Sequence, residues 1–271
     1  VGSGAFLFAA LSILQPLYEA CLDRMAEMVD ELSRAETRPH PEKLRDFRDV
    51  LADVDRHPNR AYYVLKSIIV NNLYGVDIMD EAVEICKLRL FLKLVAEVDT
   101  LDEVEPLPDI DFNIRAGNTL VGFATLKQAE GALSTISVRS LAEINEKAEG
   151  LARGFAQFRA QQTTHGGAVT PRHKQELRER LASLAGDLDL YLAGAYGIIA
   201  TDRSSLEAWK ASHKPFHWCV EFYAIVEQAG GFDVVIGNPP YVAYGPRALG
   251  YSVRGYATLP CGNLWGFSVE Q

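Results

Sequence analysis

The residues of this chain that are best suited to chemistry are Asn238, Pro239, Pro240 and Tyr241. They follow an apolar run, residues 234–236, which predicts an interior parallel strand that breaks at a turn. Proline has no backbone N–H, so two consecutive prolines leave their carbonyl groups free to accept hydrogen bonds. An amide oxygen, a free carbonyl and an aromatic ring suit a planar group that carries an amine. Such an amine, when it donates both protons, directs its lone pair at an electrophile such as a methyl group.

The same four residues are also compatible with a plain turn. Asn-Pro and Pro-Pro are ordinary turn dipeptides, and the tetrad alone does not separate a turn from a ligand site. The strand predicted before it favours the ligand site, because open α/β sheets bind ligands beyond the carboxyl ends of their strands.

A second candidate site lies at the start of the chain, where Gly2, Ser3 and Gly4 precede a helix that opens with Ala5 and Phe6. Small residues let the backbone approach a ligand, and a helix N-terminus favours a carboxylate or phosphate. A nucleotide-binding loop and a simple tight turn are equally compatible with this short pattern.

Asp77 ends a short strand that we expect over residues 72–78, before a helix that Asp80 would cap over residues 81–98. In doubly wound nucleotide sites an acid in this position accepts hydrogen bonds from ribose hydroxyls. A helix cap or a surface acid is the alternative, and the apolar neighbours of Asp77 favour the ribose. The glycines lie much farther away than the usual ~20 residues, so helices must be inserted between them. The apolar face expected for the helix consists of Val83, Leu88, Leu90, Leu92 and Val95.

Gly117 and Asn118 follow the next expected strand, residues 112–115, where a contact to an adenine edge would fall; an ordinary turn is the alternative. His213 and His217 could suggest a metal site. Pro215 lies between them and breaks the helical register, so we expect these histidines to pack near the last strand instead.

The rest of the chain is predominantly helical in pattern. Amphipathic helices are expected from residue 5 to about 29, with Pro39 and Pro41 interrupting, and again over 42–54 and 61–70. Residues 126–212 are rich in Ala, Glu, Arg and Gln, broken once at 163–171, and predict a helical hairpin inserted between sheet strands. Its charges indicate mainly a solvated face, with a partner-binding surface as the lesser alternative.

Composition restricts the classes of protein. The 271 residues are 48% hydrophobic and carry a net charge of -9, which argues against a module that grips nucleic acid through its own basic face. Four separated cysteines predict free buried thiols in a reducing cytoplasm. The apolar stretch 5–14 is about half the length of a membrane span and predicts a buried helix of a soluble protein. Both ends of the chain suggest a piece of a longer polypeptide.

Four motifs in order carry a family resemblance: Gly-Ser-Gly-Ala-Phe, Tyr-Gly-Val-Asp-Ile, Gly-Asn-Thr-Leu and Ile-Gly-Asn-Pro-Pro-Tyr-Val. With them, the chain resembles the gamma-class N6-adenine DNA methyltransferases, in the branch of type IIG restriction-modification and phage-defence methylases. The resemblance implies an α/β fold, a Rossmann-like S-adenosylmethionine-dependent methyltransferase sheet with large helical insertions. Residues 1–271 would be a partial catalytic domain that lacks its first strand and its target-recognition domain, and 126–212 an insertion within it.

The resemblance also implies roles for individual residues. The glycine loop would line the methionine end of S-adenosylmethionine, Asp77 would hold the ribose, and Asn118 would stand near the cofactor adenine. Asn238 and the Pro239 carbonyl would grip the target amine, and Tyr241 would stack on a flipped-out base. The chain departs from the family pattern at Val1, where a cysteine is usual, and at Ser268, where an aromatic residue is common. The implied set is catalytic Asn238, Pro239, Pro240 and Tyr241, and cofactor-binding Gly2, Ser3, Gly4, Ala5, Phe6, Asp77, Ile78, Asn118 and Thr119.

The function expected from all of this is site-specific methylation of adenine N6 in DNA, without a metal or a covalent enzyme intermediate. Double-stranded DNA would be held largely by parts outside this chain, with a fused or partner nuclease or defence subunits, in the cytoplasm and with no membrane. An RNA or protein-glutamine methyltransferase is the enzyme alternative, because a side-chain amide offers the same two protons. A non-catalytic scaffold of a defence complex is the alternative from a different class.

Overall fold

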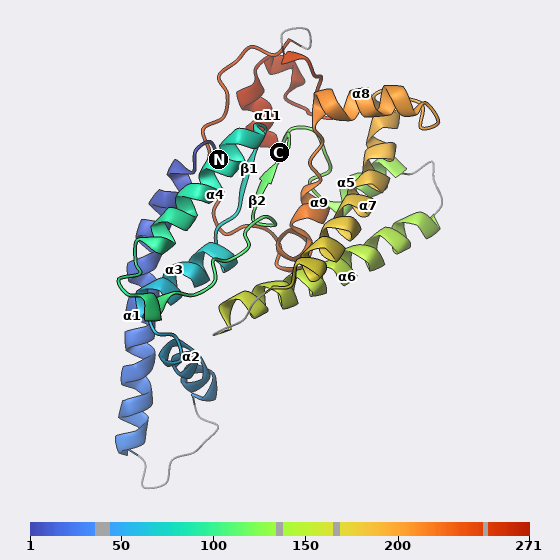
Figure 1. Cartoon of the computed structure of the whole chain (residues 1–271). Helices are drawn as coiled ribbons and strands as arrows, with labels where there is room; N and C mark the ends of the chain where they lie inside the picture. The colour runs from blue at the N-terminus through green and yellow to red at the C-terminus, as the bar shows by residue number, and fades with distance from the viewer. Residues whose placement is uncertain (36–43, 134–137, 165–168, 246–248) are drawn as a thin grey trace. The chain divides into compact units, whose positions relative to one another are not determined.

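The computed structural model describes residues 1–35, 44–133, 138–164, 169–245 and 249–271 (Figure 1). These residues are mostly helical and form two compact units. The first unit consists of Val1–Gly75, Glu81–Ile114 and Phe158–Val169, and the second of Val76–Asp80, Arg115–Gln157 and Thr170–Gln271.

The helices expected at the start of the chain are confirmed. The first begins directly after Gly4, whose φ of 86° is a left-handed conformation that glycine adopts without strain. Asn59 caps the third by accepting a hydrogen bond of 2.9 Å from the backbone N–H of Tyr62. The expected interruption at Pro39 and Pro41 lies outside the described residues. The helices are α1 (Ala5–Ala35), α2 (Arg45–Asp55), α3 (Arg60–Asn71) and α4 (Asp80–Val95), followed by the 3₁₀ turn η1 (Leu101–Glu103).

The first unit has one hydrophobic core, in which α2 and α3 both pack against α1. α1 contributes Leu7, Leu11 and Leu22 to it. The expectation of a buried α1 is met only on that face, since Ile13 and Leu17 are exposed. α1 is long and apolar enough to cross a membrane, but the core helices of globular proteins meet the same two criteria. In the most apolar stretch of α1, 17% of the residues are buried.

The apolar face predicted for α4 is partly wrong. Val83 and Leu90 are buried as expected, and Cys86 and Leu94 join them in the core. Leu88, Leu92 and Val95 instead lie exposed, with about half of each side chain in contact with solvent. α4 is apolar on two sides, so the sequence pattern could not show which side the core would take.

The cysteines are free thiols among the described residues, but only two of the four are buried as expected. Cys86 and Cys219 lie in the interior, whereas Cys21 and Cys261 are exposed. Burial is the main cause that raises the pKa of Cys219 to about 12. A thiol in this state is not a nucleophile at neutral pH.

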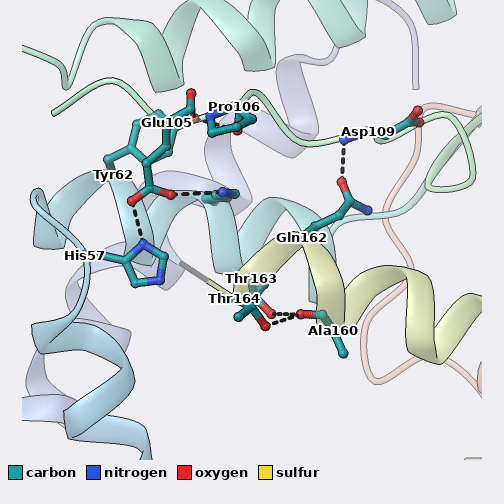
Figure 2. A network of polar contacts seen from close by, with 10 residues as sticks. His57, Tyr62, Glu105, Pro106, Asp109, Ala160, Gln162, Thr163 and Thr164 are labelled. Atoms are coloured by element: carbon teal, nitrogen blue, oxygen red, sulfur yellow. Dashed lines mark hydrogen bonds and ion pairs between the residues drawn. The ribbon is translucent and has the colours of Figure 1, made fainter. Parts of the chain in front are cut away.

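A buried polar cluster joins α3 to the acidic link that follows α4 (Figure 2). Glu105 accepts hydrogen bonds from His57 Nδ1 at 2.5 Å and from Lys66 Nζ at 3.1 Å. All three side chains are at least nine-tenths buried. Farther along the link, the backbone N–H of Asp109 donates to the Gln162 side chain. The charges of this cluster are therefore compensated within the first unit.

The sheet is much smaller than a Rossmann sheet in the residues described. β1 (Gly75–Asp77) and β2 (Ile114–Ala116) pair in parallel, with Gly75 N–H donating to Asn113 O and Gly117 N–H to Asp77 O. Both strands were expected at these places. The interior strand expected at residues 234–236 is wrong for this structure: Val234 and Val235 are 78% and 82% exposed. A strand requires a hydrogen-bonded neighbour, and within the described part of the chain residues 233–241 form no backbone hydrogen bond.

The second unit is built on helices, and residues 126–212 are mostly helical as expected, although the chain leaves the helical conformation a second time between Ala195 and Arg203, a break that the sequence pattern did not predict. α6 and α7 approach closely at Gly154, where an added Cβ would lie 2.6 Å from Leu177 Cδ2. Residues 158–169 belong to the first unit, so the segment is not a unit of its own. The helices are α5 (Leu126–Leu133), α6 (Val138–Thr163), α7 (Pro171–Ala195), α8 (Arg203–His213), α9 (Trp218–Glu221) and α11 (Leu264–Glu270), with the short turns η2 (Ala224–Gln228) and η3 (Leu259–Cys261).

Candidate cofactor and amine site

Asp77 lies at the carboxyl end of β1 and shapes the turn into α4. One carboxylate oxygen accepts a hydrogen bond of 3.0 Å from the backbone N–H of Met79, two residues ahead. This local bond fixes the side chain at the strand end. Asp77 is partly buried, whereas the next residue, Ile78, is 40% exposed. The strand therefore presents an acceptor at its end, beside an exposed apolar side chain.

Asn118 follows β2 and is almost completely buried, with 3% of its surface exposed. Its side-chain oxygen accepts the backbone N–H of Leu120 at 3.1 Å, and its own backbone N–H donates to Lys214 O at 2.7 Å. The side-chain nitrogen has no hydrogen-bond partner in the described structure. A buried amide donor without an acceptor costs free energy unless a ligand satisfies it.

Pairing of the two strands brings these residues to one edge. Gly117 N–H donates to Asp77 O at 2.8 Å, so the carboxyl ends of β1 and β2 lie side by side. Asp77, Ile78, Asn118 and Thr119 are therefore brought together within the second unit. The edge beyond the carboxyl ends of parallel strands is where such sheets bind ligands.

Residues 214–221 hold the turn after β2 in place. Phe216 N–H donates to Val121 O at 2.7 Å, and Cys219 N–H donates to Phe123 O at 3.4 Å. Phe216 packs on both glycines of the turn: a Cβ at Gly117 would lie 2.7 Å from its ring, and one at Gly122 would lie 1.9 Å from its carbonyl oxygen. Only residues without a side chain fit at these two positions.

His217 is buried beneath this turn. Its Nδ1 accepts the backbone N–H of Phe123 at 3.2 Å, so that nitrogen carries no proton. The proton is therefore on Nε2, which donates to Asp189 at 3.1 Å, and Asp189 also pairs with Lys210 at 3.2 Å. Both ring nitrogens have these partners, so His217 packs between the turn after β2 and Asp189 of α7, and not near the expected last strand, which does not form.

A second, partly buried charge pair supports β2. Arg115 pairs with Glu221 at 2.8 Å. Burial raises the pKa of Glu221, and the charge of the Arg115 guanidinium opposes this rise. The pair ties the strand to α9.

Asn238, Pro239, Pro240 and Tyr241 lie in the second unit on a segment without regular secondary structure, which is exposed except at the half-buried Pro239. The Tyr241 ring is 75% exposed. Directly afterwards the chain becomes fixed, because Val242 O accepts the backbone N–H of Leu264 at the start of α11. The tetrad thus offers its acceptors and its ring to solvent, next to an anchored segment.

The glycine loop belongs to the first unit and is described within it alone. Gly2 and Gly4 both have positive φ, and Gly4 packs on Cys86, whose sulfur would lie 2.8 Å from an added Cβ. Arg89 donates to the carbonyl and the hydroxyl of Ser3, at 2.6 and 3.1 Å. Ala5 and Phe6 form the first turn of α1.

Comparison with known proteins decides the family. The model of the Eco57I restriction-modification methylases matches residues 71–248. The chain belongs to this family. The matched span contains Asp77, Asn118 and the tetrad of this restriction-modification methylase, but it begins after the glycine loop. A putative type II restriction enzyme and methyltransferase of Methanocaldococcus jannaschii is 31% identical over 236 residues. The match covers 67% of this chain and 20% of that relative, so the chain spans about a fifth of its length. No solved structure matches the chain.

Several residues around this candidate site carry no specific local sequence signal. Lys214, Phe216 and Tyr251 all adjoin Asn118 or its turn, and burial raises the pKa of the Tyr251 hydroxyl. The available signal was the dense group Lys-Pro-Phe-His-Trp at residues 214–218. Its histidine suggests a metal ligand, whereas the aromatic and backbone contacts that the group makes cannot be recognised from spacing.

Proposed function

We propose that this methylase chain is part of a site-specific DNA adenine-N6 methyltransferase of the gamma class, which transfers a methyl group from S-adenosylmethionine to a flipped-out adenine. The single observation that carries the proposal is the exposed Asn-Pro-Pro-Tyr tetrad, residues 238–241, within the span that matches the methylase family. Its chemistry matches an exocyclic amine on an aromatic ring.

The tetrad would hold the target base. The Asn238 side-chain oxygen and the Pro239 carbonyl are two acceptors for the two protons of one amine, and Tyr241 supplies a face on which the base stacks. An amine held in this way is pyramidal and has its lone pair available. When bound, the cofactor would supply the methyl group, its sulfonium becoming a thioether as the amine gains the N–C bond and releases one proton to solvent. The acceptors stabilise the positive charge that develops on nitrogen.

The edge formed by β1 and β2 would hold the cofactor, which supplies an electrophilic methyl group on a sulfonium. Asp77 fits a ribose because its carboxylate lies at the strand end. Asn118 fits an adenine because its buried side-chain nitrogen lacks an acceptor, which a ring nitrogen would provide. Ile78 and Thr119 flank these two residues, and Gly2, Ser3, Gly4, Ala5 and Phe6 would serve the methionine end.

The partners follow from the same proposal. The substrate is double-stranded DNA in the cytoplasm, and a nuclease or defence subunit acts with the methylase, either fused or separate. The name of the relative, a restriction enzyme and methyltransferase, supports the fused arrangement. With a net charge of -9, this chain would leave most phosphate contacts to other parts of the protein.

The test is transfer of a tritiated methyl group from S-adenosylmethionine by the full-length protein. We expect label on adenine N6 after the duplex is digested to nucleosides, and none on cytosine, RNA or glutamine peptides. Asn238→Ala removes one of the two acceptors and should lower kcat by ~10²–10³, with cofactor affinity unchanged. Asn71→Ala, at an exposed asparagine at the end of α3, is the matched control. Label on any other acceptor, or full turnover by Asn238→Ala, would overturn the proposal.

A further inference from the structure

One residue of the second unit contacts the turns that follow both strands. The Lys214 carbonyl accepts the backbone N–H of Asn118 at 2.7 Å, and the next residue, Pro215, forms a parallel bridge with Asn118. The Lys214 side chain reaches the other turn, where its Nζ donates to Ile78 O at 3.1 Å and to the Asp80 carboxylate at 2.7 Å. Backbone and side chain of Lys214 therefore connect the two strand ends.

The backbone conformation of Lys214 is one that a residue with a side chain adopts only at an energetic cost. Lys214 ends α8 in the left-handed region, with φ 45° and ψ 57°. Glycine adopts this conformation without strain, whereas a residue with a Cβ does so at a cost. In the described structure only Leu44 is a second non-glycine residue with positive φ. The contacts of the Lys214 ammonium offset a strain that glycine would have avoided.

The pairing with Asp80 is favourable even though it is exposed. The hydrogen bond from Lys214 and then its charge lower the pKa of Asp80. Asp80 is the first residue of α4, so the ammonium fixes the start of that helix and, through Ile78 O, the turn after Asp77.

We propose that Lys214 is a positioning residue for the cofactor, which holds the turns after β1 and β2 together so that Asp77 and Asn118 face one ligand. This inference rests on the proposed function, because the ligand is S-adenosylmethionine. Its two side-chain contacts go to Ile78 O and Asp80, so the side chain acts on the ligand through these protein groups, while the backbone carbonyl holds Asn118. Its loss should weaken cofactor binding and leave the methyl-transfer step intact once cofactor is saturating.

The experiment compares Lys214→Met, Lys214→Arg and the wild type in the full-length protein. Methionine keeps the Cβ and most of the stem but removes the ammonium, so backbone strain is unchanged. We expect Lys214→Met to raise both Kd and KM for S-adenosylmethionine by about fivefold, the scale of one exposed ion pair with one further hydrogen bond. Lys214→Arg should recover most of that loss. kcat and KM for DNA should stay at wild-type values in both variants.

Two further variants separate positioning from general stability. Lys147→Met removes an exposed lysine that pairs with Asp187 between α6 and α7, and it should leave cofactor affinity unchanged. Asp80→Asn removes the ion pair but keeps the bond to Ile78 O, so it should weaken binding by less than Lys214→Met does, and the double variant should be no weaker than Lys214→Met alone.

The outcomes are distinguishable. If the wild-type protein does not bind S-adenosylmethionine, the proposed function fails and this inference fails with it. If the wild type binds and Lys214→Met binds equally well, only the inference is overturned. The inference would also be overturned if Lys214→Met lowered the Tm and Lys214→Arg did not restore cofactor affinity. A fall in the kcat of Lys214→Met at saturating cofactor would overturn it as well.

Discussion

At the scale of residues, the best sequence signals were single polar side chains directly after apolar runs. Asp77 and Asn118 were both singled out in this way, and the structure brings them to one edge because their strands pair. The residues that hold them, Lys214 and Phe216, could not be found in the same way. Their role depends on contacts across about 100 positions of the chain, which no local spacing encodes.

Replacing Asp77 tests the cofactor side of the site. Asp77→Ala should weaken S-adenosylmethionine binding by at least about tenfold, since a hydrogen bond to a charged group contributes about 1.5–3 kcal/mol. Isothermal titration calorimetry on the full-length protein measures this directly. Asp55→Ala, at an exposed aspartate that ends α2, is the control and should bind normally. Equal affinities of the two variants would remove Asp77 from the site.

Glu105 makes the stability of the first unit dependent on pH. Burial raises its pKa, but the hydrogen bonds and charges of His57 and Lys66 together outweigh burial, so the pKa lies below the ordinary 4.5. A carboxyl group with a lowered folded pKa contributes stability above its unfolded pKa and loses it as the pH falls through the folded value. The free energy of unfolding should therefore fall on acidification from pH 5 to about pH 3.

Urea unfolding of Glu105→Gln at several pH values tests this. At pH 7 the variant should be less stable by about 3 kcal/mol, because Lys66 is left buried without a charged partner. It should also lose part of the acid dependence. Glu84→Gln, which removes a carboxylate that is 72% exposed in its pair with Lys87, should change stability by less than about 1 kcal/mol. Similar results for both variants would show that the buried cluster does not stabilise the unit.

At the scale of elements, helices were predicted well and helix faces less well. Periodicity and capping residues located α1 to α4, since both signals are local. The orientation of α4 was missed because Leu88, Leu92 and Val95 continue an apolar pattern on the side that the core does not use. Which of two apolar sides becomes buried depends on the neighbouring elements, and these are set by tertiary structure.

The contact between the turn after β2 and residues 214–221 predicts a sharp difference between two glycines. Gly122→Ala would place a Cβ 1.9 Å from the Phe216 carbonyl, so the backbone must shift, and the variant should lose about 1–3 kcal/mol of stability. Gly186→Ala lies inside α7 in open space and should instead stabilise by up to about 1 kcal/mol, because alanine favours helices. Thermal unfolding of both variants measures the difference, and a neutral Gly122→Ala would contradict this packing.

At the scale of the whole molecule, the sequence predicted an α/β sheet and the described structure contains two paired strands. β1 and β2 were predictable because each finds the other within the chain. Residues 234–236 have the composition of a buried strand, but a strand also requires a neighbouring strand whose N–H and C=O groups pair with its own. Whether such a neighbour is present depends on the assembled sheet and cannot be read from local composition.

Hydrogen exchange tests this account of the sheet. In this chain the amides of residues 234–236 should exchange at nearly unprotected rates, because no carbonyl accepts them in the part of the structure described. The amides of Gly75 and Gly117, which donate to Asn113 O and Asp77 O, should be protected and serve as the internal control. Protection of 234–236 in this chain would contradict the structure. If the amides of residues 234–236 were protected only in a longer form of the protein, the apolar run would form its strand when a neighbouring strand is supplied. The tetrad, residues 238–241, would then lie at the carboxyl end of a paired strand.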